Sequence, residues 1–270
     1  MSNDDHNTAI TLSRAGLRWV REGRGPTLVL VHELGGSLHS FDQLTPLLRD
    51  RFTLVRYDLR GHGQSIKTKD GYALEAQIQD LQSVLDAAEV TGPFWLLTIA
   101  AASPMAVTLA TRSTRVAGLV MCSPAIAMDD KRAANLCARA DEAERDGMAA
   151  IIDSTLERSY PPEVRHDKLA FENYWAMLLQ NAPSCYAQAN RALAATRTAT
   201  LAGTLRCPVL CLAGRHDKVR PPALIQELAH SIAGSEFAVL EGAHLLHYQS
   251  PAAVAEAVAR FVTSQAGPSV

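Results

Sequence analysis

Short apolar runs that alternate with helical segments are the feature of this sequence that most constrains its fold. Thr27–Val31, Thr53–Tyr57 and Phe94–Ile99 are runs of mainly aliphatic, β-branched and aromatic residues. Helical spacing follows each run, for example in Leu74–Val90 with its apolar residues three or four positions apart. Strands that are apolar on both faces occur in parallel sheets covered by helices on both sides. The pattern therefore predicts an α/β fold with a mainly parallel sheet.

The other expected elements continue this alternation and bring the sheet to eight strands. Two short strands around residues 10–12 and 16–21 are expected to pair as a hairpin. Further strands are expected at Val116–Met121, Pro208–Ala213 and Glu236–Leu240, and further helices at Phe41–Asp50, Ala101–Arg112, Pro222–Ala233 and Pro251–Thr263.

The interval 125–200 breaks the alternation, because it contains helical patterns and no strand-like run. We expect an inserted helical cap at residues 125–200 and a core formed by residues 1–124 and 201–270. Such a cap is expected over the carboxyl ends of the strands, where open α/β sheets bind their ligands.

The uncharged stretch Val90–Thr111 is long enough to cross a bilayer. Pro93 and Pro104 break it, however, so a buried strand followed by a core helix is the better interpretation. The first ten residues are polar and acidic, whereas a signal peptide needs basic residues and then an apolar run. We therefore expect no membrane segment and a cytoplasmic location.

Charge and cysteine content narrow the class of ligand. Lys and Arg number 26 against 28 Asp and Glu, and no basic stripe is present, so a small-molecule substrate is expected and nucleic acid is not. The five cysteines are scattered without a C-x-x-C pair, which predicts neither a disulfide framework nor a zinc site. No cofactor and no metal are expected.

Four segments resemble motifs of the α/β-hydrolase fold. His32–Gly36 resembles the H-G-x-G-G oxyanion loop, and Tyr57–Ser65 resembles the D-x-R-G-x-G-x-S segment. Cys207–Asp217 looks like the strand that ends in the catalytic acid, and Glu241–His244 looks like the loop of the catalytic histidine. Their order and spacing are most similar to 3-oxoadipate enol-lactonases and their relatives.

The resemblance implies roles for particular residues. His244 would be the general base, and Asp217 would accept the second N–H of its ring. The backbone N–H groups of Leu34 and Ala101 would form the oxyanion hole. His32, Glu33 and Ser123 are expected to contact the substrate.

Two positions depart from the family pattern. Ala100, in Thr98–Ala102, occupies the place of the nucleophilic serine, so an acyl-enzyme at this position is excluded. Ser103, Ser123 and Cys122 are the nearby alternatives, although Ser103 is expected to point away from the turn. Glu33 replaces a glycine, and its carboxylate either orients a water or a cationic substrate group or faces solvent.

Several functions are compatible with this pattern. The leading hypothesis is an enzyme that hydrolyses a small activated carbonyl compound (an enol-lactone, ester or carbamate) with a His-Asp dyad and no serine acyl-enzyme. Relatives that resemble aminoacrylate hydrolases also carry alanine at this position. The alternatives are a cofactor-independent lyase, decarboxylase or oxygenase that uses the same dyad, a serine hydrolase with an inactivating Ser-to-Ala change, and a non-catalytic ligand-binding homologue.

Overall fold

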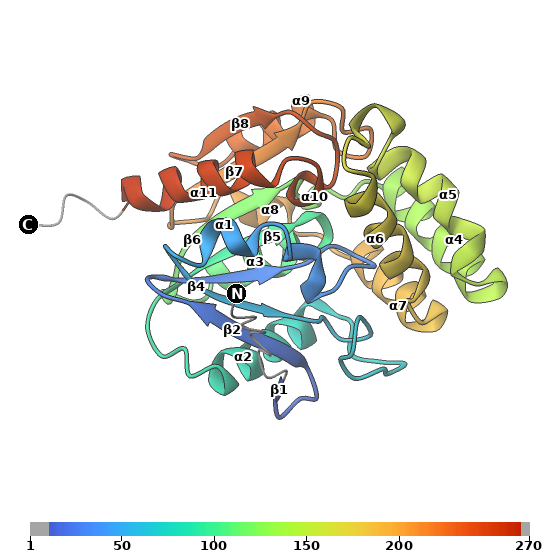
Figure 1. The fold of residues 1–270 in the computed structure, drawn as a ribbon, viewed down its shortest axis with the longest axis horizontal. Helices are drawn as coiled ribbons and strands as arrows, with labels where there is room; N and C mark the ends of the chain where they lie inside the picture. Colours follow the sequence, from blue (N-terminus) through green and yellow to red (C-terminus); the bar gives the residue numbers. More distant parts are fainter. Residues whose placement is uncertain (1–10, 266–270) are drawn as a thin grey trace, which may run out of the picture.

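Eight strands form one sheet in the order β1-β2-β4-β3-β5-β6-β7-β8 in the computed structural model, which describes residues 11–265 (Figure 1). The strands are β1 (Thr11–Leu12), β2 (Arg18–Gly23), β3 (Thr27–Val31), β4 (Thr53–Tyr57), β5 (Phe94–Ile99), β6 (Val116–Cys122), β7 (Val209–Gly214) and β8 (Glu236–Leu240). β2 pairs antiparallel with β1 and β4, and the other neighbouring strands are parallel. This arrangement confirms the expected mainly parallel sheet of eight strands.

The expected strand bounds differ from the observed ones mainly at the N-terminus. β2 begins at Arg18, which pairs with Leu12 of β1, and continues to Gly23, because residues 19–23 pair with β4. Residue 10 of the first expected strand lies outside the described residues. The hairpin between β1 and β2 is present.

The helices outside the interval 125–200 cover both faces of the sheet (Figure 1). They are α1 (Thr45–Leu48), α2 (Leu74–Ala87), α3 (Ser103–Ala110), α9 (Pro222–His230), α10 (Leu246–Gln249) and α11 (Pro251–Gln265), with the 3-10 turns η1 (Leu38–Phe41) and η2 (Ala100–Ala102). The single helix expected at 41–50 is thus divided into η1 and α1. The helix expected to reach Val90 stops earlier, before Glu89, whose φ of 54° is incompatible with a right-handed helix.

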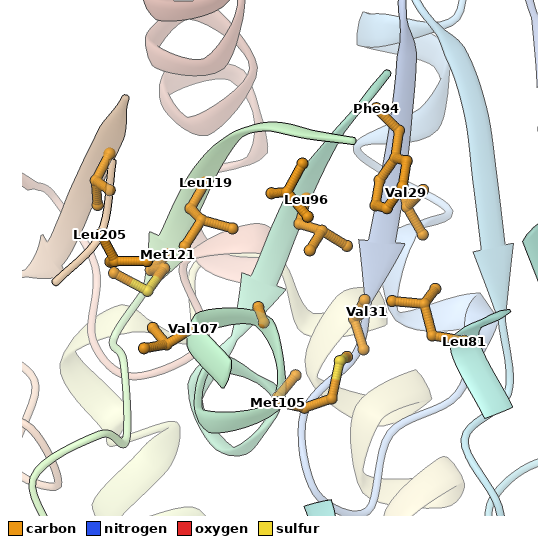
Figure 2. Packing of buried hydrophobic residues seen from close by; sticks show 14 of the residues in the cluster. Val29, Val31, Leu81, Phe94, Leu96, Met105, Val107, Leu119, Met121 and Leu205 are labelled. Carbon is orange, nitrogen blue, oxygen red and sulfur yellow. The ribbon is translucent and has the colours of Figure 1, made fainter. Parts of the chain in front are cut away.

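Alternate residues of each strand point to opposite faces, so each face has its own core. On one face α2, α3 and α9 pack against the strands, and Figure 2 shows Met105 and Val107 of α3 beneath Leu96 of β5 and Leu119 of β6. On the other face α1 and α11 pack against the alternate strand residues. Trp95 of β5 meets Phe261 of α11 edge to face there, with ring centroids 5.8 Å apart.

The interval 125–200 is helical in the structure and lies beside one end of the sheet (Figure 1). Its elements are α4 (Asp130–Asp146), α5 (Met148–Ser159), η3 (Pro162–Val164), α6 (Lys168–Leu179), α7 (Pro183–Ala194) and α8 (Ala199–Ala202). A third apolar cluster joins α5 and α6 to core residues Ala243, Leu245 and Tyr248. The division of the chain at residues 125 and 200 stays a prediction, and α8 crosses the second boundary.

Within residues 11–265, no helix has both the length and the apolar composition that crossing a membrane requires. Ala-rich α3, the second half of the uncharged stretch, covers the sheet and contributes to its core.

Candidate active site

The residues expected to do chemistry follow four parallel strands, at the edge where those strands end. Glu33 comes after β3, Ala100 after β5, Asp217 after β7 and His244 after β8. Because the carboxyl ends of parallel strands meet at one edge of a sheet, segments far apart in the sequence converge there.

The turn between β5 and α3 is sharp, and Ala100 stands at its tip. Ala100 has a φ of 46°, a left-handed conformation that costs a residue with a Cβ about 1–2 kcal/mol. Thr98 and Ser103 lie at the base of the turn, where their hydroxyl oxygens are 3.1 Å apart. Ala102 packs into the core. The turn therefore keeps a strained shape although its tip carries only a methyl group.

The three alternative nucleophiles are not among the residues that line the main cavity near Ala100. Ser103 is fully buried against Thr98. Ser123 is also fully buried, and its backbone N–H donates to the carbonyl of Leu212 at 2.8 Å. Burial raises the pKa of the Cys122 thiol to about 12. The side chain of Ser123 lies close to Asp217, whose pKa it helps to lower, and its expected contact with a substrate stays a prediction.

Leu34 and Ala101, the two expected oxyanion donors, both line this cavity. Neither backbone N–H donates a hydrogen bond to another residue in the described part of the chain. Gly35 follows Leu34 with a φ of 82°, and the N–H of Gly36 donates to the carbonyl of Glu33 at 3.0 Å, which closes the loop into a turn. Two residues whose amides have no hydrogen-bond partner in the described part of the chain thus line one cavity from two separate loops.

His244 and Asp217 form a hydrogen-bonded pair. The Nδ1 of His244 donates to Oδ2 of Asp217 at 2.8 Å, and the other carboxylate oxygen accepts the backbone N–H groups of Val219 and Arg220. Burial by itself would raise the pKa of Asp217, but attraction to His244 and these hydrogen bonds outweigh it, so the pKa is lowered. The carboxylate stays ionised, and it directs the second ring nitrogen of His244, Nε2, away from itself and leaves it available to a bound molecule.

His32 supports the oxyanion loop from inside. Its Nδ1 donates to the carbonyl of Glu33 at 2.7 Å, and its Nε2 accepts the backbone N–H of Leu59 at 2.9 Å. Burial lowers the pKa of His32, so the ring is neutral with its proton on Nδ1. Both nitrogens are occupied and the ring is fully buried. The expected substrate contact of His32 is corrected to a structural role.

The segment Tyr57–Ser65 holds the same loop. The buried carboxylate of Asp58 accepts the backbone N–H groups of Leu38 and Gln64, each at 2.7 Å. The hydroxyl of Ser65 donates to the Asp58 carbonyl at 2.6 Å. Through Asp58 this motif therefore holds η1, which follows the oxyanion loop.

Glu33 lines the cavity wall, yet its carboxylate is directed to protein partners. Oε1 accepts the hydroxyl of Ser40 at 2.9 Å. Oε2 lies 3.1 Å from Nε2 of His247, at an angle that makes the contact electrostatic rather than a well-formed hydrogen bond. Its side chain is only 3% exposed. Of the alternatives left open for Glu33, exposure to solvent is thereby excluded.

The cavity between the strand ends and the helices of the interval 125–200 has a volume of about 130 Å³. Ala100, Leu34, Ala101 and His244 line one part of it, and the side chains of α4, α5, α6 and α7 line another. Sequence reasoning missed its four arginines, Arg132, Arg139, Arg158 and Arg220. The signal that was available is the spacing of Arg132 and Arg139, since residues seven apart share one face of a helix.

A metal site finds no support in the described residues. No group of three or more His, Cys, Asp or Glu side chains in residues 11–265 is arranged to hold a metal ion. His247, which is one helical turn after His244, is paired with Glu33 instead.

Comparison with known proteins places this site in context. Residues 28–257 match the sequence profile described as "Alpha/beta hydrolase family". The 3-oxoadipate enol-lactonase 2 of Acinetobacter baylyi is 25% identical over 237 residues, which cover 86% of this chain and 87% of that protein.

Solved structures with the same fold cover nearly the whole chain. The enol-lactonase from Burkholderia xenovorans LB400 superposes with a TM-score of 0.88 and 24% identity, over 94% of this chain and 100% of that one. A thermophilic esterase from Thermogutta terrifontis gives a TM-score of 0.88 and 24% identity, over 95% and 98% of the two chains. At this identity the likeness establishes the shared fold.

Proposed function

Because the chain belongs to the α/β hydrolase family, we propose that it hydrolyses a small activated carbonyl compound, such as an enol-lactone, without forming a serine acyl-enzyme. The relatives named as 3-oxoadipate enol-lactonases support this class of substrate. The proposal concerns the reaction and the residues that carry it out.

One observation carries the proposal. The His244 ring, held by Asp217 at 2.8 Å, lines the same cavity as Ala100 and the unpaired amides of Leu34 and Ala101. A general base and a pair of oxyanion donors around one space are the groups that attack of water on a carbonyl requires.

Water supplies the attacking oxygen in the proposed mechanism, since Ala100 has no hydroxyl. Nε2 of His244 takes a proton from the water as its oxygen bonds to the carbonyl carbon, and the Asp217 carboxylate stabilises the resulting imidazolium. The amides of Leu34 and Ala101 bind the negative charge that develops on the carbonyl oxygen. The C–O bond to the leaving group then breaks, and the imidazolium returns its proton to the leaving oxygen. General-base assistance of this kind contributes about 100- to 10,000-fold.

The strained turn at Ala100 supports a working oxyanion hole. The left-handed conformation costs free energy and supports no nucleophile here. Ala101, the next residue, lines the cavity, and we propose that its N–H binds the carbonyl oxygen of the substrate there. The free energy that the strained turn costs is offset if the Ala101 amide binds a substrate oxygen.

The reaction class is tested by incubation with 3-oxoadipate enol-lactone in ¹⁸O-labelled water, together with a panel of related enol-lactones and aryl esters. We expect turnover with one labelled oxygen in the acid product. A product that forms without the label indicates the lyase or decarboxylase alternative and contradicts hydrolysis. Saturable binding across the panel without turnover indicates a ligand-binding protein and also contradicts the proposal.

The absence of an acyl-enzyme is tested with Ala100→Ser. We expect this variant to lose activity on the best substrate of the panel, because the added hydroxyl takes the position of the water and bonds to His244. It gains at most slow hydrolysis of activated aryl esters, with a burst of the aryl product. In a serine protease, removing the nucleophile costs about a millionfold, so a gain of several orders of magnitude in Ala100→Ser would overturn the mechanism.

A further inference from the structure

The cavity that holds the proposed catalytic groups carries a large excess of positive charge. Four arginines line it, Arg132, Arg139, Arg158 and Arg220, and among residues 11–265 the only carboxylate in its wall is that of Glu33. The Glu33 carboxylate is already engaged by His247 and Ser40. It therefore does not neutralise the arginines.

Three of the four guanidinium groups have no carboxylate partner. Arg132 forms an ion pair with Asp129, which precedes α4. For Arg139, Arg158 and Arg220, no carboxylate lies within ion-pair distance in residues 11–265. The side chain of Arg220 makes one hydrogen bond to the protein, from Nη1 to the carbonyl of Ala127 at 2.8 Å.

Arg220 is the most informative of the three because it is buried. The residue is 5% exposed, and burial together with the nearby charge of Arg132 lowers the pKa of its guanidinium to about 10. At neutral pH the group is still a cation. Attraction to Asp217 and Asp129 opposes this lowering of the pKa, but within residues 11–265 these carboxylates form their ion pairs with His244 and Arg132. A buried cation without a direct ion pair is costly, and an anion in the cavity would offset that cost.

The arginines come from both sides of the cavity. Arg132 and Arg139 lie seven residues apart on α4, and Asn135 and Leu136 between them also line the cavity, so one face of this helix is directed into it. Arg158 is in the last turn of α5. Arg220 belongs to the core, where its backbone N–H donates to Asp217 at 2.7 Å. Cations therefore surround the space next to His244.

The third arginine of α4 differs from the cavity arginines in its surroundings. Arg145, near the end of α4, is not part of the cavity wall, is 68% exposed and pairs with Asp146 at 2.6 Å. Arg139, Arg158 and Arg220 thus differ from Arg145 in lining the cavity and in having no carboxylate partner in residues 11–265. Arginine's planar, forked group binds carboxylates and phosphates through two parallel hydrogen bonds.

We propose that the substrate is a small multivalent anion, with at least two carboxylate or phosphate groups in addition to the carbonyl that is attacked. This inference rests on the proposed function only in assigning the substrate to this cavity. Arg139 and Arg158 bind anionic groups on the side of α4 and α5, and Arg220 binds one beside the dyad. Apolar residues of the wall, such as Leu136 and Leu193, are left to contact the carbon skeleton.

Calorimetric titration tests the proposal without any need for turnover. The probes are tricarballylate (three carboxylates), glutarate (two), butyrate (one) and glycerol 3-phosphate. We expect affinity to rise with the number of carboxylates, by about tenfold for each added ion pair. Relative affinities of tricarballylate and glycerol 3-phosphate distinguish carboxylate from phosphate as the anionic group.

Matched variants assign the effect to the cavity. We expect Arg139→Gln alone to weaken tricarballylate binding about tenfold, and Arg139→Gln with Arg158→Gln about a hundredfold. Arg145→Gln, which removes one charge from α4 outside the cavity, should leave the binding unchanged. Equal affinity for tricarballylate and butyrate would overturn the proposal, and so would an equal loss in the Arg145→Gln control.

A second measurement needs only the unaltered chain. Raising KCl from about 50 to about 500 mM should weaken tricarballylate binding much more than butyrate binding, because salt screens ionic attraction. Equal salt effects contradict the proposal. His244→Ala should bind tricarballylate as before, because it keeps all four arginines. In the unaltered chain, graded binding without hydrolysis of any compound in the panel would contradict only the proposed hydrolysis, and hydrolysis without graded binding would contradict only the anionic substrate.

Discussion

Two histidine–carboxylate pairs lie beside the cavity, and the comparison between them shows how similar residues acquire different roles. Asp217 holds His244, and Glu33 faces His247. Both carboxylates are buried, at 0% and 3% side-chain exposure. The histidines differ, since His244 is 12% exposed and His247 is fully buried.

The two histidines present different ring nitrogens to their carboxylates, so different nitrogens remain available to a bound molecule. His244 uses Nδ1, so Nε2 stays available in the cavity. His247 presents Nε2 to Glu33, and its ring packs between Phe41 and Tyr248, at centroid distances of 5.6 Å and 4.6 Å. A substrate can therefore reach the first histidine and not the second. The first pair suits proton transfer, and the second fixes the oxyanion loop to α10.

The electrostatics of the two carboxylates are alike. Burial alone would raise the pKa of each, but attraction to the neighbouring histidine outweighs burial and lowers both pKa values. Charge on the acid therefore does not separate the roles. The roles are separated by whether a substrate can reach the second ring nitrogen of the histidine.

The largest expected effect comes from the exposed histidine. His244→Gln should reduce hydrolysis of the best substrate by about 100- to 10,000-fold, because it removes the base. Its melting temperature should stay close to that of the unaltered chain, since the ring borders a cavity and little packing is lost. Steady-state kinetics and a thermal melt check both points, and a large loss of stability would assign His244 a structural role.

The buried histidine should show the opposite behaviour. His247→Leu leaves the Glu33 carboxylate buried without its partner, which costs about 3–5 kcal/mol of unfolding free energy. Urea denaturation measures the loss. The matched double variant, Glu33→Gln with His247→Leu, removes the buried carboxylate together with the histidine and should recover most of it. No recovery would show that packing of the His247 ring, rather than its charge, is what stabilises the loop.

A smaller effect is expected at the other partner of Glu33. Ser40→Ala removes the hydroxyl that donates to Oε1 at 2.9 Å, and a hydrogen bond to a charged group is worth about 1.5–3 kcal/mol. Urea denaturation should give a loss in this range and below that of His247→Leu. An equal or larger loss would identify Ser40 as the main partner of Glu33.

The smallest effect concerns stability in acid. Because the folded-state pKa values of Glu33 and Asp217 lie below their unfolded values, both groups contribute stability that is complete above about pH 4 and is lost as the pH falls below it. Each contributes at most about 1.4 kcal/mol per pH unit. Glu33→Gln and Asp217→Asn should each flatten this acid decline in urea titrations between about pH 3 and pH 5. Unchanged slopes would show that these carboxylates titrate alike in the folded and unfolded chain.

Local sequence patterns were sufficient to predict most of the strands and helices of the fold. The apolar runs at Thr27–Val31 and Phe94–Ile99 became β3 and β5 with the expected bounds, because strand formation here depends on neighbouring residues and on a sheet buried on both faces. The helical interval 125–200 was likewise apparent from its spacing. The helix expected at 41–50 was not divided correctly, since the capping of η1 by Ser37 involves side-chain geometry that spacing alone does not give.

Motif positions were sufficient to nominate His244, Asp217 and Ala100, because the carboxyl ends of parallel strands must meet at one edge of the sheet. Only the tertiary structure decided the remaining roles. It buried His32 between two backbone groups, placed the side chain of Ser123 close to Asp217 and paired Glu33 with His247.

The arginine lining depends on the tertiary structure for the same reason. Arg139 and Arg220 come from a cap helix and a core loop that meet only when the chain folds. The sequence by itself determined most of the strands and helices and the strand ends at which the candidate site is proposed, because those depend on periodicity and chain order. The packing of segments far apart in the chain decided which side chains line the cavity and which charges are paired. Burial and charge pairing depend on contacts between such segments, and these contacts form only in the folded protein.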